Sequence, residues 1–179
     1  MDELQRQAAE MRTLAELPPT PERWAAVRVA LTSKFEGTQA GALRVLGGWG
    51  GREAVEALRG FLTQAFSRRT GWAVRSVATR ALAGLVTAAD VPWILDLYFG
   101  LPGTLEKHEL MRLVITLPPE AARDRLVAEL RSADPLNRQA AVKAIGNMPY
   151  EDRRQLLWPL REDPHKFVGK SARLLTQET

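Results

Sequence analysis

The chain has 179 residues, of which 45% are hydrophobic, 26% charged and 7% aromatic. This composition is typical of a folded protein and argues against disorder throughout, and the length favours one domain or one repeat array over a large two-domain enzyme. The 25 basic and 21 acidic residues give a net charge of +4. Such a charge permits an acidic protein partner or a nucleic acid but requires neither.

Several classes of protein are disfavoured by what the sequence lacks. Without Cys there can be no disulfide framework, thiolate zinc site or thiol nucleophile, and His108 and His165 alone do not make a metal site. No apolar run is long enough for a transmembrane helix, and the acidic start MDELQRQAAEMR does not resemble a signal peptide. Nucleotide-binding, hydrolase and metalloprotease motifs are absent as well. We therefore expect a cytoplasmic protein without cofactor, metal or membrane contact.

Helices are expected along the whole chain. The first, within residues 1–17, carries Leu4, Ala8, Met11 and Leu14 on one side and ends at a proline cluster. Later breaks follow at Gly and Pro, and apolar residues between them recur at intervals of three and four, which is the helical period. No segment alternates with period two, so the fold class is predicted to be all-α.

An internal repeat is visible in the second half of each predicted helical pair. The stripe Arg75-x-x-Ala78-x-x-Ala81-Leu82 returns as Arg138-x-x-Ala141-x-x-Ala144-Ile145. Anchoring on it predicts second helices at 39–47, 75–83, 107–115, 138–146 and 168–176. The matching first helices are predicted at 22–33, 52–66, 89–99, 119–131 and 151–161.

This pattern resembles the HEAT repeat, a helical hairpin whose second helix carries an Arg-x-x-Ala-x-x-Ala-Leu-Gly-like stripe. The resemblance implies a right-handed α-solenoid of about five hairpins, because single hairpins cannot bury their apolar stripes alone. It divides the chain into a capping helix at 1–17 and an array at 21–179, with repeats at 21–49, 50–86, 88–117, 118–148 and 149–177. A compact four-helix bundle with extra helices is the competing fold, which explains the helices but not their recurrence.

One basic residue recurs in the second helices. Because second helices line the concave surface of HEAT-like arrays, these side chains are candidates for a basic ladder that binds an acidic peptide or a row of phosphates. Long basic side chains that merely cover neighbouring apolar surface are the alternative. The ladder consists of Arg44, Arg80, Arg112, Lys143 and Arg173.

A second candidate site combines tryptophan with arginine. Trp49 lies in the glycine cluster 47–51, where a loop is expected, and Trp72 opens a second helix just after Arg68 and Arg69. Exposed Trp beside Arg is typical of interface hot spots and of base-stacking platforms. Rings that fill gaps between repeats are the alternative interpretation. The remaining tryptophans, Trp24, Trp93 and Trp158, are predicted to be core residues.

Two arginines are interpreted as structural. Arg75 and Arg138 occupy the position at which HEAT repeats usually place an inter-repeat arginine. Asp134 precedes Arg138 by four residues, a spacing that allows the two side chains to pair on a helix.

Three functions remain open at this stage. The first is a non-enzymatic scaffold that binds a protein or acidic peptide along its concave surface. The second is nucleic-acid binding, as in HEAT-like DNA glycosylases, for which Trp93, Asp96 and Tyr98 are the nearest match. A subunit of a bilin lyase is the remote third, and no residue of this sequence supports it specifically.

Overall fold

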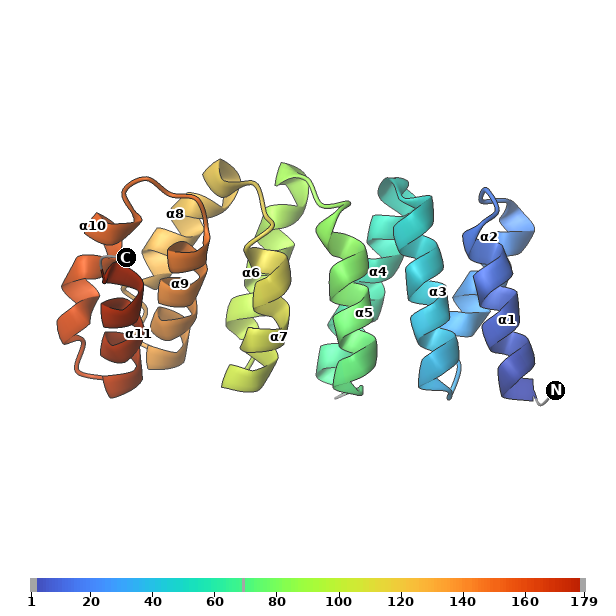
Figure 1. Cartoon of the computed structure of the whole chain (residues 1–179), viewed down its shortest axis with the longest axis horizontal. Coiled ribbons are helices and arrows are strands. Elements are labelled where there is room, and N and C mark those ends of the chain that lie inside the picture. The colour runs from blue at the N-terminus through green and yellow to red at the C-terminus, as the bar shows by residue number, and fades with distance from the viewer. Residues whose placement is uncertain (1–2, 69, 178–179) are drawn as a thin grey trace. The chain divides into compact units, whose positions relative to one another are not determined.

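The computed structural model describes residues 3–68 and 70–177. Within these residues every regular element is a helix and no strand occurs, so the predicted all-α class is confirmed. None of the described helices combines the length and hydropathy needed to cross a membrane. Backbone contacts divide the chain into two compact units, Met1–Val86 (unit 1) and Thr87–Thr179 (unit 2) (Figure 1).

The described part of unit 1 contains α1 (Glu3–Ala15), α2 (Pro21–Leu31), α3 (Glu36–Trp49), α4 (Gly51–Ser67) and α5 (Trp72–Ala83). They form two layers, since α1 and α5 pack on either side of α3 while α2 and α4 pack behind them (Figure 1). The core lies between the layers and includes Leu43, Leu58 and Leu82, each fully buried. On the first helix Met11 and Leu14 are buried as predicted. The side chains of Leu4 and Ala8 lie outside the described part.

Local sequence explains where these helices begin and end. Thr20 caps α2 by accepting a hydrogen bond from the Arg23 amide at 3.3 Å, and Pro21 follows at the first helical position. The glycine cluster was expected to break the chain from residue 47 onward. The helix instead continues to Trp49, and the break comes at Gly50 and Gly51, whose φ angles are +66° and +75°. Only these two glycines adopt the positive φ that glycine favours.

Two other glycines allow the helices of the α1–α3–α5 layer to approach closely. A Cβ atom on Gly41 would lie 2.8 Å from Met11 Cβ, and one on Gly47 would lie 3.0 Å from Ala81 Cβ. Both distances are shorter than carbon atoms tolerate without movement. These two positions therefore require glycine for packing.

A pair of alanine substitutions tests this packing. Gly41→Ala is expected to lower the free energy of unfolding by about 1–3 kcal/mol, because the new methyl group overlaps Met11. Gly60 lies exposed in the middle of α4 with open space around it. Gly60→Ala is therefore expected to raise the free energy of unfolding by about 1 kcal/mol through helix propensity alone. Urea titration of both variants gives the answer, and a stabilising Gly41→Ala would contradict the close contact of α1 with α3.

Unit 2 is also built in two layers, with α7, α9 and α11 in one layer and α6, α8 and α10 in the other. Tyr98, Leu110 and Leu126 are buried between them. The described elements are a 3₁₀ turn η1 (Ala88–Asp90), α6 (Val91–Gly100), α7 (Thr104–Val114), α8 (Pro119–Glu129), α9 (Pro135–Asn147), α10 (Arg153–Leu157), a second 3₁₀ helix η2 (Trp158–Glu162) and α11 (Lys166–Thr176).

One helix differs from its prediction. The segment 151–161 was expected to be a single helix, but α10 gives way to η2 at Trp158. Pro159 has no amide hydrogen to donate, so the α-helical bond from this position is lost and the chain tightens into 3₁₀ geometry. This change turns Trp158 outward, and the prediction that it is a core residue is wrong. Trp158 is 49% exposed, with the Arg161 guanidinium 4.0 Å from its ring centroid.

A buried lysine ties α7 to the end of α6. Lys107 is only 3% exposed, and its Nζ donates hydrogen bonds to the carbonyl oxygens of Tyr98 at 2.9 Å and Phe99 at 2.8 Å and to Asn137 Oδ1 at 2.9 Å. The carbonyls belong to the last turn of α6, which lacks intrahelical donors and carries the negative end of the helix dipole. Burial lowers the pKa of Lys107. All three ammonium hydrogens nevertheless have acceptors.

The role of Lys107 recurs along the chain. The fourth residue of α3, α5, α7 and α9 is in each case a long side chain that donates to carbonyl oxygens just before its own helix. These donors are Gln39 to Leu31 and Ser33, Arg75 to Thr70, Lys107 to Tyr98 and Phe99, and Arg138 to Ser132 and Ala133. The fourth residue of α11 is Gly169, which has no side chain to play this part.

Arg138 also makes an ion pair, although not with the expected residue. Its Nε and Nη2 donate to the two carboxylate oxygens of Asp163 at 2.8 and 2.9 Å, and the Asp163 side chain is only 4% exposed. Asp134 instead caps α9 by accepting from the Leu136 amide at 2.9 Å. The interpretation of Arg138 as structural stands, but the predicted pairing with Asp134 is wrong. A capping carboxylate points to the helix amides, and is then not directed at the side chain one turn later.

This ion pair predicts an acid-sensitive contribution to stability. The hydrogen bond from Arg138 holds the pKa of the Asp163 carboxyl below its ordinary value of 3.8. The folded state therefore binds this proton less tightly than the unfolded chain. The stabilisation is complete above the unfolded pKa and is lost as the pH falls through the lower folded pKa. Urea titrations from pH 6 down to about pH 2 should show a drop in unfolding free energy that is smaller in Asp163→Asn. An equal drop in both proteins would contradict this assignment.

Candidate basic interaction face

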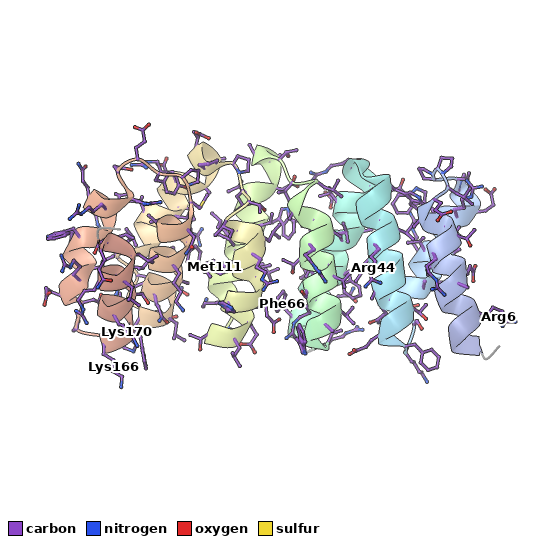
Figure 2. All side chains as sticks on the ribbon, viewed as in Figure 1. Arg6, Arg44, Phe66, Met111, Lys166 and Lys170 are labelled. Atoms are coloured by element: carbon purple, nitrogen blue, oxygen red, sulfur yellow. The ribbon has the colours of Figure 1, made fainter. Side chains whose placement is uncertain are left out.

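Two of the predicted ladder residues meet on unit 1. Arg44 on α3 and Arg80 on α5 are both exposed and line one hollow of about 520 Å³ between these helices. Figure 2 labels Arg44 on α3. Gly47 and Ala81 form its floor, where the two helices touch. The close contact at this floor holds the two arginine-bearing helices together. The other lining residues are Val77, Gly84 and Leu85.

A third arginine extends this face. Arg12 on α1 is exposed and shares with Arg44 a second hollow of about 260 Å³, which lies on the other side of α3. Arg44 therefore stands between two hollows, with Arg12 beyond one and Arg80 beyond the other. The repeat pattern does not predict Arg12, because the first helix does not carry the stripe that aligns the other helices. We call Arg12, Arg44 and Arg80 the arginine row.

The charged side chains that line both hollows are all positive. Among the residues that the structure describes, the charged lining residues are the three arginines, and none of the described carboxylates lines either hollow. Ala15, Ala81 and Leu85 add accessible apolar surface to the hollows, whereas the lining residues Met11 and Val77 are buried. Guanidinium groups donate in a planar fork that matches carboxylate and phosphate oxygens. The face is therefore suited to an anionic partner that also carries apolar groups.

The remaining ladder residues lie on unit 2 and do not all share one face. Arg112 on α7 is exposed and Lys143 on α9 is half-buried. Each stands five positions after the fourth residue of its helix, as Arg44 and Arg80 do. On α11 that position belongs to Leu174, which is 59% exposed.

The prediction that Arg173 belongs to the ladder is therefore wrong, because it does not stand at the equivalent helix position. Its Nη1 donates to the Arg161 carbonyl of η2, and it passes over Gly169. It points toward the layer of η2 rather than along the row. The sequence register of the last repeat was one residue off, since Gly169 rather than Val168 stands where the other helices have their donor.

Trp49 does not form the exposed site that was predicted for it. It is the last residue of α3 and is half-buried, with its ring 5.0 Å from that of Trp24 at an edge-to-face angle of 61°. Its Nε1 donates to the Leu17 carbonyl at 2.8 Å. The prediction of an exposed loop residue is wrong, because α3 continues through Gly47 and Gly48. Trp49 is a packing residue, and Trp24 beside it is half-buried rather than fully buried.

Trp72 is exposed as predicted. It is the first residue of α5 and 68% of its surface is accessible. Arg68, the residue that ends α4, is exposed as well, whereas Arg69 lies outside the described residues. α3 and α5 run side by side in the same direction, since Glu36 meets Gly71 at one end and Gly47 meets Ala81 at the other. Trp49 and Trp72 therefore lie at opposite ends of the layer and do not form one site.

The residues that suggested a glycosylase do not converge. Tyr98 is buried and its hydroxyl donates to the Ala140 carbonyl at 3.2 Å. Asp96 is exposed and pairs with Arg125 at 3.1 Å, while Trp93 is half-buried and donates to Asp90 at 3.4 Å. Each of the three side chains is thus engaged in a different direction. Among the described residues no three His, Asp or Glu side chains gather as metal ligands.

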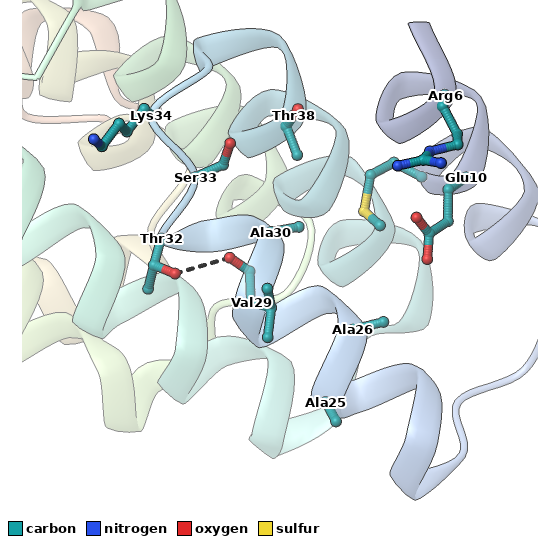
Figure 3. A pocket seen from close by; sticks show the side chains of 11 residues that line it. Arg6, Glu10, Ala25, Ala26, Val29, Ala30, Thr32, Ser33, Lys34 and Thr38 are labelled. Atoms are coloured by element: carbon teal, nitrogen blue, oxygen red, sulfur yellow. Dashed lines mark hydrogen bonds between the residues drawn. The ribbon is translucent and has the colours of Figure 1, made fainter. Parts of the chain in front are cut away.

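The hollow shown in Figure 3 is lined by none of the three arginines of the row, although Met11 lines both this hollow and the smaller one beside Arg12. It has a volume of about 740 Å³ and lies between α1, α2 and the start of α3. Val29, 71% exposed, and Ala26 line it from α2, while Arg6, Glu10 and Lys34 bring charges of both signs. With mixed charge around it, this hollow does not select a ligand by electrostatics.

Comparisons with known proteins provide no family. No family model matches the chain, and no curated protein matches it either. Among solved structures, one that resembles it is the crystal structure of an engineered protein, with 20% sequence identity over 98% of this chain and 96% of the other. The TM-score of that match is 0.45, which is too low to support an argument about fold or function.

Proposed function

We propose that the chain is built of HEAT-like helical hairpins and acts as a non-enzymatic scaffold for a protein partner. The hairpins would be α2–α3, α4–α5, α6–α7, α8–α9 and the helix pair that ends with α11, following the capping helix α1. The recurrent donor at the fourth residue supports this proposal. One structural role repeated at one helix position is what copies of a single hairpin produce.

The partner would be an acidic protein segment that binds along the arginine row. The observation that carries this proposal is that Arg12, Arg44 and Arg80 line two adjoining hollows, with no carboxylate of the described residues among the lining. Such a surface attracts and orients carboxylates, and charges at an interface act mainly on specificity and on the association rate. In HEAT-like arrays the second helices, which α3 and α5 would be, line the concave binding surface.

Two features favour a protein partner over a nucleic acid. The hollows have accessible apolar surface from Ala15, Ala81 and Leu85, which side chains of a peptide can cover. A phosphate backbone has no such groups, and its binding rests on many basic contacts rather than on three. Nucleic acid is therefore an alternative outcome of the binding test and not the proposal.

Charge reversal on the arginine row tests this function. Arg44→Glu combined with Arg80→Glu is expected to weaken binding of a short fluorescein-labelled peptide, with clusters of Glu on both sides of a central Ser, by about tenfold or more. The reason is that each change removes an attraction and adds a repulsion. Fluorescence anisotropy at low and at near-physiological salt measures the effect.

The matched control keeps the net charge equal. Arg131→Glu combined with Arg153→Glu changes two exposed arginines of unit 2 and should leave peptide affinity within about twofold. Equal losses in both double variants would show a general charge effect and would contradict the proposal. Absence of peptide binding by the parent protein at low salt would refute it, as would a clear preference for labelled DNA.

A further inference from the structure

Unit 1 exposes a second large aromatic residue beside Trp72. Phe35, which caps the start of α3, is 45% exposed, and Trp72 at the start of α5 is 68% exposed. Apolar rings of this size are normally buried, and exposed ones that gather at one place mark interaction sites. Trp72 was predicted to be exposed, whereas no sequence pattern predicted exposure of Phe35.

The two rings lie at neighbouring helix ends. A Cβ atom built on Gly71 would overlap Glu36 Oε1, so the residues next to Phe35 and Trp72 are in direct contact. Lys34 and Arg68 are exposed in the adjoining loop and helix end. We call Lys34, Phe35, Arg68 and Trp72 the aromatic edge.

We propose that the aromatic edge holds an apolar anchor of the same acidic segment that the arginine row binds. This inference rests on the proposed function and adds the second half of the partner's chemistry: an aliphatic or aromatic side chain a few residues away from the carboxylates. Exposed Trp and Phe flanked by Lys and Arg form the composition of an interface hot spot, in which a few aromatic residues carry most of the binding energy. Lys34 and Arg68 outnumber the exposed carboxylate of Glu36, which contacts Gly71 at this edge, so the edge has a net positive charge that suits an acidic segment.

The helix geometry sets the distance between the apolar anchor and the carboxylates of the partner. From Phe35 to Arg44 and from Trp72 to Arg80 the helices rise by about 12–13 Å. Between Phe35 and Arg44, α3 carries Gly37, which has open space around the position of a side chain. An extended peptide covers about 13 Å in four residues. The anchor and the carboxylate therefore stand about four residues apart.

Two labelled peptides test this inference. The first is the acidic peptide above, with Glu clusters centred about four residues on either side of the central Ser. The second carries Leu in place of that Ser. Anisotropy titrations should show that the Leu peptide binds the parent protein at least about tenfold more tightly. Phe35→Ala combined with Trp72→Ala should abolish this preference, yet leave the affinity for the Ser peptide unchanged.

The outcomes separate the two proposals. If both peptides bind the parent protein equally, or if the double alanine variant keeps the preference for Leu, the aromatic edge is not the anchor site while the arginine row stands. If neither peptide binds at low salt, the proposed function itself fails. Both rings are exposed, so the variant should fold, and its circular dichroism and thermal midpoint should match those of the parent protein. Placing the Glu clusters next to the Leu should remove the preference, and its survival would refute the spacing.

Discussion

Lys107→Met is expected to lower the free energy of unfolding by about 3 kcal/mol, a large effect for one substitution. Methionine has nearly the same length but cannot donate, so the carbonyls of Tyr98 and Phe99 and the side-chain oxygen of Asn137 lose their hydrogen bonds inside the protein. Removing a charge from the interior offsets part of the loss. The cost of the three acceptors that lose their donor is larger than this gain, because all three hydrogen bonds are lost together.

Urea titration followed by circular dichroism measures this effect. Arg112→Met on the same helix is the matched control, since Arg112 is exposed and its loss should change the free energy of unfolding by less than about 0.5 kcal/mol. If Lys107→Met is as stable as the control, Lys107 does not stabilise the join between α6 and α7. This result would contradict the claim that the donor at the fourth helix residue stabilises the fold.

Asp163→Ala should have a comparable effect, with a loss of about 3 kcal/mol. The carboxylate is nearly inaccessible, accepts two hydrogen bonds from Arg138 and also accepts one from the His165 amide at 2.9 Å. Its removal leaves a mostly buried guanidinium without its counter-charge. Breaking such a pair costs more than the pair itself contributes, because the remaining charge is still desolvated.

The exposed ion pair of Asp96 provides the control for this substitution. Asp96→Ala removes a carboxylate that is 66% exposed and paired with Arg125, so it should cost less than about 0.5 kcal/mol. A double-mutant cycle of Asp163→Ala with Arg138→Met should show coupling, with the double variant more stable than the sum of the single losses predicts. Additive losses would mean that the two side chains do not act as a pair.

Much of the helical architecture could be predicted from local sequence. Periodic apolar residues bounded by Pro and Gly indicated helices, as at Asp134-Pro135, because capping and helical period are short-range effects. The tightening at Pro159 was not foreseen, although proline carries that signal, because the apolar period continued through it. Trp158 was placed in the core for the same reason. Burial depends on which way a helix is turned, and one change of helix type alters it.

The candidate site could be predicted only in part. Arg44 and Arg80 were found from their recurrence, since a repeated position projects equivalent side chains to one side. Arg12 was missed because nothing in α1 repeats the stripe, and Phe35 because a residue outside the helical period gives no signal of exposure. Arg173 was misplaced by a one-residue shift in register. These three depend on packing between segments far apart in the chain, which no local pattern records.

The most direct test of the central claim is an NMR titration of the ¹⁵N-labelled protein with the unlabelled acidic peptide. Binding along the arginine row predicts that the largest amide shift changes fall on α1, α3 and α5, around Arg12, Arg44 and Arg80, and that they weaken as salt is raised. Shift changes confined to unit 2, or spread evenly over all exposed arginines, would contradict the claim that this face is the binding site.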